Sequence, residues 1–280
     1  MADMLSTHQA PSVRDAANPR LLARALDDLA LGLGRWRLPL ALAQMDIRNR
    51  YRGSVLGPFW LTLSTAVMLV SLGFLYSQLF KLELRQYLPY LAVSLITWNV
   101  IAGMVNEGSN ALIEQEGVIR QMPQPYSVHA LRCVLRNMIV AAHNLPLILL
   151  VFLACNAWPG PEALWALLGL LLFVVDALAA AVLFGMLSAR FRDIGPIVAS
   201  LMQIAFFVSP VIWKPQLLGE NAKWLPFNPV YAVMETVRGP LVEGGVSPLI
   251  WLAALVYSAM LCGAAFALFV RFRSRIAFWV

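Results

Sequence analysis

Few side chains in this sequence have the types and spacing that catalysis requires. A phosphate-binding loop places a lysine after a glycine-rich turn, as in G-x-x-x-x-G-K-[ST]. The three lysines, Lys81, Lys214 and Lys223, instead follow Phe, Trp and Ala. The sequence has no Asp-x-Asp pair for a metal and a sugar phosphate, and its one pair of adjacent acids is Asp27 and Asp28. We therefore expect no catalytic residues and no ATP site in this chain, which disfavours a membrane glycosyltransferase.

The cysteines, His143 and Asp176 lie in or beside apolar stretches, and their spacing does not predict a metal or catalytic site. The three cysteines lie far apart in apolar surroundings: Cys133, Cys155 and Cys262. We expect buried, inert thiols, and no metal site, because His143 has no second histidine at ligand spacing. Asp176 lies within a long apolar stretch, where a carboxylate costs at least about 2.5 to 3.5 kcal/mol. It should face protein or water, either in a transport pathway, beside an arginine, or as a neutral hydrogen-bonded group.

The elements that must position these residues follow from composition. Of the 280 residues, 60% are apolar and 13% are charged, and the mean hydropathy is +0.71, whereas soluble domains have roughly 45 to 50% apolar and about 25% charged residues. Apolar runs long enough for the hydrocarbon core predict an all-α polytopic membrane protein with six spans: 59–80, 88–105, 138–155, 164–187, 197–213 and 249–270. These spans form one domain, 59–270, between an N-terminal arm, 1–58, and a tail, 271–280.

Basic residues predict the orientation of the spans. Sixteen of the 21 Lys and Arg residues fall in the N-terminal arm, in the loops after the second and fourth spans, or in the tail. Because basic flanks stay in the cytoplasm, we expect both termini there, in a bacterial inner membrane. No short apolar stretch with a small-residue cleavage site precedes the first span, so no cleavable signal peptide is expected. The net charge of +6 indicates membrane lipids, not nucleic acid, as partners.

An amphipathic helix is predicted before the first span. Asn18 and Pro19 can start it, and residues 1–17 before them are expected to be disordered. A leucine stripe follows at helical spacing: Leu22, Leu26, Leu29 and Leu33. Asp27 and Asp28 are expected on the opposite face, among Arg24, Arg35 and Arg37. The pattern favours a helix on the membrane surface, and a solvated helix docking on a soluble partner is the alternative.

The longest polar insert between spans on the cytoplasmic side is 106–129. Its core, 110–120, predicts a short helix that Pro123 and Pro125 stop. Four apolar residues would form a docking face: Leu112, Ile113, Val118 and Ile119. Three charged residues would set the register with a partner: Glu114, Glu116 and Arg120. The alternative is a simple connector.

On the outer side, the insert 214–248 is too apolar for a free loop. It begins after Trp213 and contains Trp224, Phe227 and Tyr231, and from Pro229 onward its apolar residues recur at helical spacing. Glu235 and Arg238 form an i, i+3 pair. We expect short half-helices that dip back into the membrane at the mouth of a pore, with an interfacial aromatic belt as the alternative.

The sequence shows neither the internal repeats nor the several intramembrane ion-coupling groups of a secondary transporter. This absence predicts transport driven by another subunit.

Three segments resemble one transporter family. RYRGSVLGPFW at 50–60, RFRDIG at 190–195 leading into MQIAFFVSPVIW at 202–213, and FNPVYAVMETVRGPL at 227–241 are similar to polysaccharide-exporting ABC transporter permeases, the Wzm and KpsM group. The resemblance covers roughly residue 38 to the C-terminus.

This resemblance implies an assembly and a set of roles. The chain would form a homodimer docked on two copies of a cytoplasmic ABC ATPase, which would hold the ATP and Mg²⁺, and would move a lipid-linked capsule or O-antigen polysaccharide outward. The helix at about 108–122 would couple to the ATPase, and 214–248 would form an outer gate. Aromatic residues would line the sugar path: Phe59, Trp60, Phe74, Tyr76, Trp98, Phe206 and Phe207.

Two arginines at the start of the first span receive a role from their position. Arg50 and Arg52 lie where cytoplasmic headgroups would meet the helix, and arginine forks match phosphate oxygens. We expect them to bind the phosphate of the lipid anchor, although positive-inside anchoring alone would also explain each arginine. A teichoic-acid or drug exporter permease, or an integral-membrane glycan-modifying enzyme, are the alternative functions.

Overall fold

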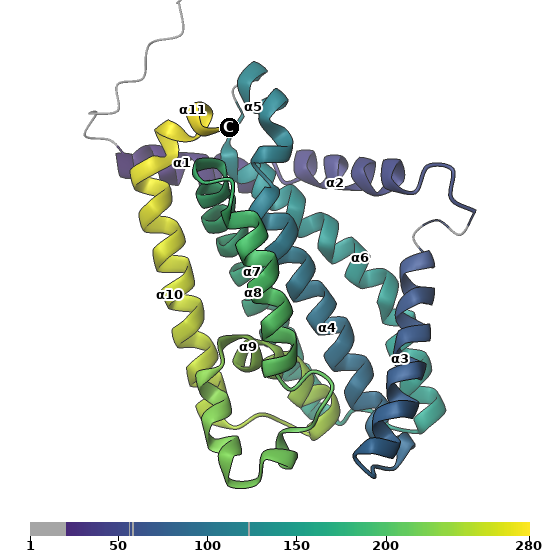
Figure 1. Cartoon of the computed structure of the whole chain (residues 1–280). Helices are drawn as coiled ribbons and strands as arrows, with labels where there is room; N and C mark the ends of the chain where they lie inside the picture. The colour runs from purple at the N-terminus through teal and green to yellow at the C-terminus, as the bar shows by residue number, and fades with distance from the viewer. Residues whose placement is uncertain (1–20, 56, 58, 123) are drawn as a thin grey trace, which may run out of the picture.

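The computed structural model describes residues 21–280 except 56, 58 and 123, and within them every regular element is a helix (Figure 1). The expected disordered arm, 1–17, and the helix start at Asn18 and Pro19 lie outside the described residues. The long helices are α3 Phe59–Leu79, α4 Leu84–Asn110, α6 Tyr126–Cys155, α7 Trp165–Arg190, α8 Ile194–Val208 and α10 Pro248–Phe272. The shorter helices are α1 Leu21–Gly34, α2 Arg37–Arg50, η1 Ile113–Gln115, α5 Glu116–Gln121, η2 Pro161–Leu164, η3 Pro215–Phe227, α9 Pro229–Arg238, η4 Gly239–Glu243, η5 Arg273–Arg275 and α11 Ile276–Trp279.

Five helices of the described chain are long and apolar enough to cross a membrane: Phe59–Leu79, Leu84–Asn110, Tyr126–Cys155, Pro161–Arg190 and Pro248–Trp279. The predicted fifth span is different, because α8 ends at Val208, five residues before the predicted boundary at Trp213. Its 15 residues rise about 22 Å, less than the roughly 30 Å of a hydrocarbon core. Residues 209–214 continue α8 as irregular backbone, for which apolarity alone gave no signal.

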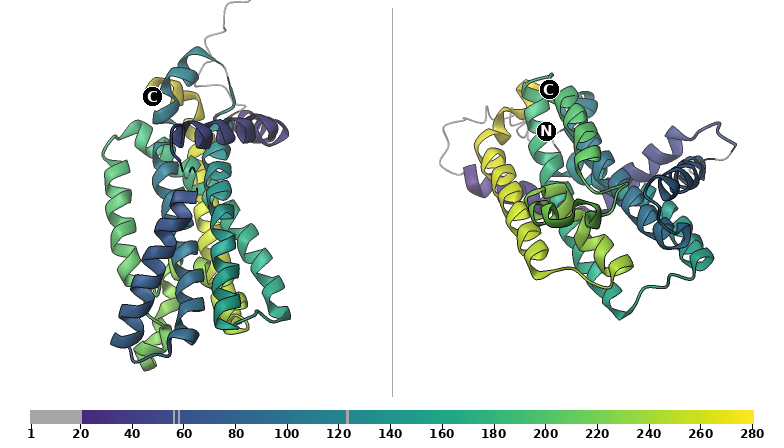
Figure 2. Two further views of the ribbon diagram at one scale, coloured as in Figure 1. Left: turned by 90° about the vertical axis from the view of Figure 1, so that its right-hand side faces the viewer. Right: turned by 60° about the horizontal axis from the view of Figure 1, so that its bottom comes forward.

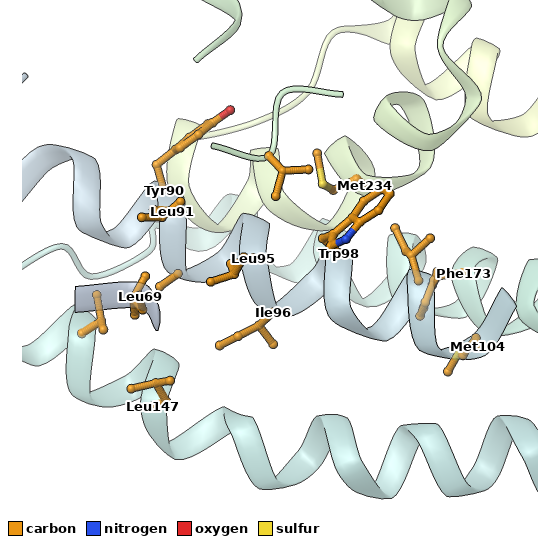
Figure 3. Packing of buried hydrophobic residues seen from close by; sticks show 14 of the residues in the cluster. Leu69, Tyr90, Leu91, Leu95, Ile96, Trp98, Met104, Leu147, Phe173 and Met234 are labelled. Carbon is orange, nitrogen blue, oxygen red and sulfur yellow. The ribbon is translucent and has the colours of Figure 1, made fainter. Parts of the chain in front are cut away.

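Helix α4 forms the centre of the bundle. Two-thirds of its most apolar window is buried, against about a sixth of that of α3. Leu95, Ile96 and Trp98 on α4 lie between Leu147 of α6 and Met234 of α9 (Figure 3). Small residues let α4 and α7 approach closely, since a Cβ added at Gly108 would lie 3.0 Å from the Cα of Ala181. The outer faces of α3 and α8 remain exposed in the single chain.

Helices α1 and α2 lie across one end of the bundle, together with α5, α11 and the C-terminus (Figures 1 and 2). This end is called the α1–α2 end below, and the opposite end, near α9, is the α9 end. The sequence analysis predicted one surface helix, and the second, α2, was missed because its apolar residues show no leucine stripe. Of the predicted stripe on α1, Leu22, Leu26 and Leu33 are exposed.

The predicted placement of Asp28 on the polar face of α1 was wrong. Its exposure is 1%, and its carboxylate accepts hydrogen bonds from the backbone N–H and the hydroxyl of Ser127. Arg273 forms an ion pair with it at 2.6 Å. Asp28 shares a line on α1 with Ala25 and Gly32, and this line packs against α6. A Cβ at Gly32 would lie 2.1 Å from the Ser127 hydroxyl, so the small residue permits the contact that buries the acid.

Candidate transport and coupling sites

The segment predicted to couple to a partner projects from the α1–α2 end as η1 and α5 (Figure 1). Two of its four predicted docking residues are instead buried in the chain's own core: Leu112 is 3% exposed and Ile119 is 9% exposed. The prediction that these four residues form an apolar docking face was therefore wrong. Both residues belong to a buried cluster with residues of α6, α7, α10 and α11, which a helical wheel of this segment alone could not show.

What the coupling segment offers to a partner is its charged side. Val118 and the side chains of Glu114, Glu116 and Arg120 are exposed, while Ile113 is half-buried. Arg120 forms an ion pair with Glu116 at 2.8 Å, and its Nε and Nη2 also donate to the main-chain oxygen of Val280 at 3.1 and 2.6 Å. Partial burial raises the pKa of Glu114, although Arg136 opposes the shift. The segment is thus held by the C-terminal residues and presents acids outward.

An ion cluster lies between α2, α6 and the coupling segment. We call Asp46, Glu107, Gln115, Arg132 and Arg136 the α2–α6 ion cluster. Arg132 binds Asp46 through two nitrogens, at 2.7 and 2.5 Å, and its Nη1 donates to Gln115 at 2.6 Å. Arg136 donates to Asp46 at 3.2 Å and to Glu107 at 3.0 Å. Burial alone would raise the pKa of Asp46, but the two arginines hold it below its ordinary value.

The two arginines predicted to bind a lipid phosphate lie at the edge of this cluster. Arg50, at the end of α2, is half exposed and donates to Glu107 at 3.1 Å. Arg52 follows in an exposed turn, where Gly53 adopts a positive φ of 86°. Arg50 therefore has one acid partner already, and its outward nitrogens and those of Arg52 remain open to a ligand. Their role in phosphate binding stays a prediction.

The seven predicted pathway aromatics fall into two groups in the single chain. Trp98 and Phe206 lie 5.4 Å apart between ring centroids, and Phe206 contacts Phe207 at 5.3 Å. Trp98 is buried, whereas Phe207 is exposed on α8. The α3 aromatics do not join this group: Phe59, Trp60 and Phe74 are exposed and Tyr76 is half-buried. The structure thus brings three of the seven together, and sugar binding at any of them remains a prediction.

A second buried cluster lies at the α9 end. Arg238 is 0% exposed and forms an ion pair with Glu235, which is 2% exposed. Its Nη1 lies 2.8 Å from the Tyr90 hydroxyl and 2.5 Å from the carbonyl oxygen of Pro210. Tyr87 donates to the carbonyl of Ile212 at 2.5 Å. We call these residues the α9 cluster, and they satisfy the irregular backbone that follows α8.

The residues predicted to form an outer gate do not share one surface. Trp224 and Phe227 are exposed, with ring centroids 5.8 Å apart. Tyr231, Glu235 and Arg238 are instead buried in α9, which packs against α4, α7 and α10. Asn228 caps α9 by accepting hydrogen bonds from the backbone of its first turn, which fixes the start of this helix. A gating role stays a prediction, but the ion pair anchors α9 rather than facing solvent.

Asp176 lies at the contact of α7 with α10. Its Oδ2 accepts a hydrogen bond from the Ser258 hydroxyl at 2.7 Å, and its exposure is 7%. Among the described residues, the side chain that hydrogen-bonds to Asp176 is this serine and not an arginine. The geometry favours the third of the predicted roles, a hydrogen-bonded structural group between two helices.

The comparisons with known proteins identify the family. The ABC-2 type transporter domain matches residues 39–242, from α2 to η4. The chain belongs to the ABC-2 type transporter family. It is 28% identical over 251 residues to the O-antigen export system permease protein RfbA of Myxococcus xanthus, covering 86% of this chain and 94% of the relative. An RfbA protein of Klebsiella pneumoniae is 19% identical over 74% of this chain and 81% of its own length. The resemblance to polysaccharide-exporting permeases is thereby confirmed.

Within this ABC-2 domain, the sequence analysis missed the α2–α6 ion cluster. Asp46 and Arg132 are 86 positions apart, so no local spacing joins them. Position in the sequence explains Arg132 and Arg136 as positive-inside charges of the region after the second span, and Glu107 lies at the edge of the insert 106–129. The one available signal was their spacing of four, which places both arginines on one face of a helix.

Proposed function

We propose that this chain is the membrane-spanning permease subunit of an ATP-driven ABC exporter that moves lipid-linked cell-surface polysaccharide, either capsule or O-antigen, across the bacterial inner membrane. The match to an O-antigen export permease over 94% of that protein carries the proposal. The ABC-2 domain match, 39–242, includes α3 to α9 and therefore both clusters, and it ends before α10.

The proposed complex contains two copies of this chain and two copies of a cytoplasmic ATPase that binds ATP and Mg²⁺. We assign the α1–α2 end to the cytoplasm, because the basic residues of α1 and α2 and those of the tail both lie there. The exposed acids of η1 and α5 at this end suit docking on the ATPase. The exposed faces of α3 and α8 are free for lipid, substrate or the second copy.

Affinity purification of the tagged chain from mild detergent, followed by mass spectrometry, tests the assembly. We expect a stoichiometric ATPase with nucleotide-binding motifs and a glycolipid, whose headgroup identifies the anchor. A chain that elutes alone, even after crosslinking, would contradict the proposal and favour a glycan-modifying enzyme. A drug exporter would instead give hydrolysis stimulated by small amphiphiles and no glycan phenotype.

Reversing the charges of the coupling segment should uncouple transport from hydrolysis. Glu114→Lys with Glu116→Lys turns the exposed acidic side basic, which repels the surface that the acids fit. We expect roughly a tenfold loss of substrate-stimulated ATPase activity, as about 1.4 kcal/mol of lost coupling would give. Asp27→Lys with Asp193→Lys makes the same change of charge at exposed positions outside the segment and should retain stimulation. Unchanged stimulation in the first pair would overturn the coupling role.

A further inference from the structure

In the α2–α6 ion cluster, a single side chain, that of Arg132, binds residues of two different elements. Arg132 lies near the first turns of α6, where its guanidinium faces α2 on one side and η1 on the other. Two of its nitrogens hold the carboxylate of Asp46, and the third nitrogen holds the amide oxygen of Gln115. Asp46 belongs to the surface helix, and Gln115 belongs to the coupling segment. Arg132 therefore joins the two elements that the proposed function places at the membrane surface and at the ATPase.

The chemistry of arginine suits this bridge. A guanidinium presents five donors in a rigid plane and can bind a carboxylate with two nitrogens while the third donates elsewhere. A lysine ammonium is a point charge that cannot hold both partners in this fixed geometry. The side chains of Arg132 and Asp46 are each 17% exposed, so water screens their interaction less than it would at an open surface.

A second arginine supports the same connection. Arg136, one helical turn further along α6, donates to Asp46 and to Glu107, and its Nη2 lies 4.0 Å from Glu114. Glu107 in turn accepts from Arg50 at the end of α2. These polar contacts from α2 to the segment 107–115 thus run through the charged groups. Both ends of the connection contact α6, which continues into the membrane.

We propose that Arg132 is a positioning residue for transport: it holds the coupling segment in register with α2, so that a substrate bound beside α2 changes the rate of ATP hydrolysis in the partner. This inference rests on the proposed function and adds the route between its two sites. Movement of α2 displaces Asp46, and the shared guanidinium transfers the displacement to Gln115. The ATPase need not touch α2 for this to occur.

The test separates the two arms of Arg132 in the purified permease–ATPase complex, reconstituted in vesicles. Gln115→Leu removes the arm to the coupling segment and leaves the Asp46 pair intact. Asp46→Asn weakens the arm to α2 and also the bond of Arg136 to the same carboxylate. The matched control is Gln121→Leu, an exposed glutamine of the same segment. The probe is the lipid-linked glycan extracted from the cells that produce the protein. The readouts are co-purification of the ATPase, basal hydrolysis, and stimulation of hydrolysis by the probe.

We expect each single variant to retain the ATPase and its basal hydrolysis, and to lose at least about fivefold of the stimulation, which is the low end of ordinary coupling between sites. The double variant should lose no more than the single ones, because both arms act through one guanidinium. Arg132→Lys should lose stimulation as the single variants do, because an ammonium cannot hold both partners. Full stimulation in Gln115→Leu, or additive losses in the double variant, would overturn the inference. A wild-type complex without a partner ATPase or without stimulation would overturn the proposed function itself.

Discussion

Replacing Arg238 with methionine should destabilise the chain more than any other single substitution proposed here. The change removes the charge partner of the buried Glu235 and the donor to the carbonyl of Pro210. Loss of one partner of a buried ion pair costs about 3 to 5 kcal/mol, which lowers the unfolding temperature by roughly 10 °C in a chain of this size. The thermal unfolding of the purified protein in detergent measures the effect.

A matched variant isolates the buried pair from arginine loss in general. Arg85→Met removes an exposed arginine at the start of α4, near the same end of the bundle, and should unfold close to the wild-type temperature. Adding Glu235→Gln to Arg238→Met should recover part of the loss, because the carboxylate no longer stays buried without its partner. If Arg238→Met unfolded at the same temperature as Arg85→Met, the α9 cluster would not stabilise the backbone after α8.

Most of the bundle could be predicted because a helix that crosses a bilayer needs an apolar run of a defined length, which the sequence shows directly. The second, third and sixth predicted spans lie within the longer helices α4, α6 and α10, and the fourth begins one residue before α7. The first ends one residue beyond α3. The end of α8 was missed for a physical reason. Residues 211–213 are apolar, so hydropathy extends the span through them. The carbonyls of Pro210 and Ile212 are instead satisfied by Tyr87, Tyr90 and Arg238, which are distant in sequence.

The candidate sites show the same limit. The pairing of Glu235 with Arg238 was predicted because three residues on a helix bring two side chains together. Their burial was not predicted, since it depends on α4 and α10, and the same holds for Asp28, which an amphipathic wheel placed in solvent. Spacing within one helix predicts which side chains meet, whereas packing between helices decides whether they face water.

The two arginines at the start of the first span bear on the substrate, and we expect Arg50→Gln with Arg52→Gln to abolish export of the polysaccharide. Two guanidinium groups would bind the phosphate oxygens of the lipid anchor, and each charge-assisted hydrogen bond contributes about 1.5 to 3 kcal/mol. Losing both should reduce transport by roughly a hundredfold or more. Surface polysaccharide on intact cells, measured beside the amount of permease in the membrane, gives the result.

The control for this pair must lose equal charge from the same stretch before the first span, because basic residues also orient the spans. Arg37→Gln with Arg48→Gln meets this condition, since both arginines are exposed on α2. The single variants separate phosphate binding from the ion cluster, as Arg50 also pairs with Glu107 and Arg52 does not lie in that pair. A defect in Arg50→Gln alone would assign the effect to the loss of the Arg50–Glu107 ion pair. A defect that requires both changes, with the control pair normal, would assign it to a shared anion, and normal surface polysaccharide in the double variant would exclude the phosphate role.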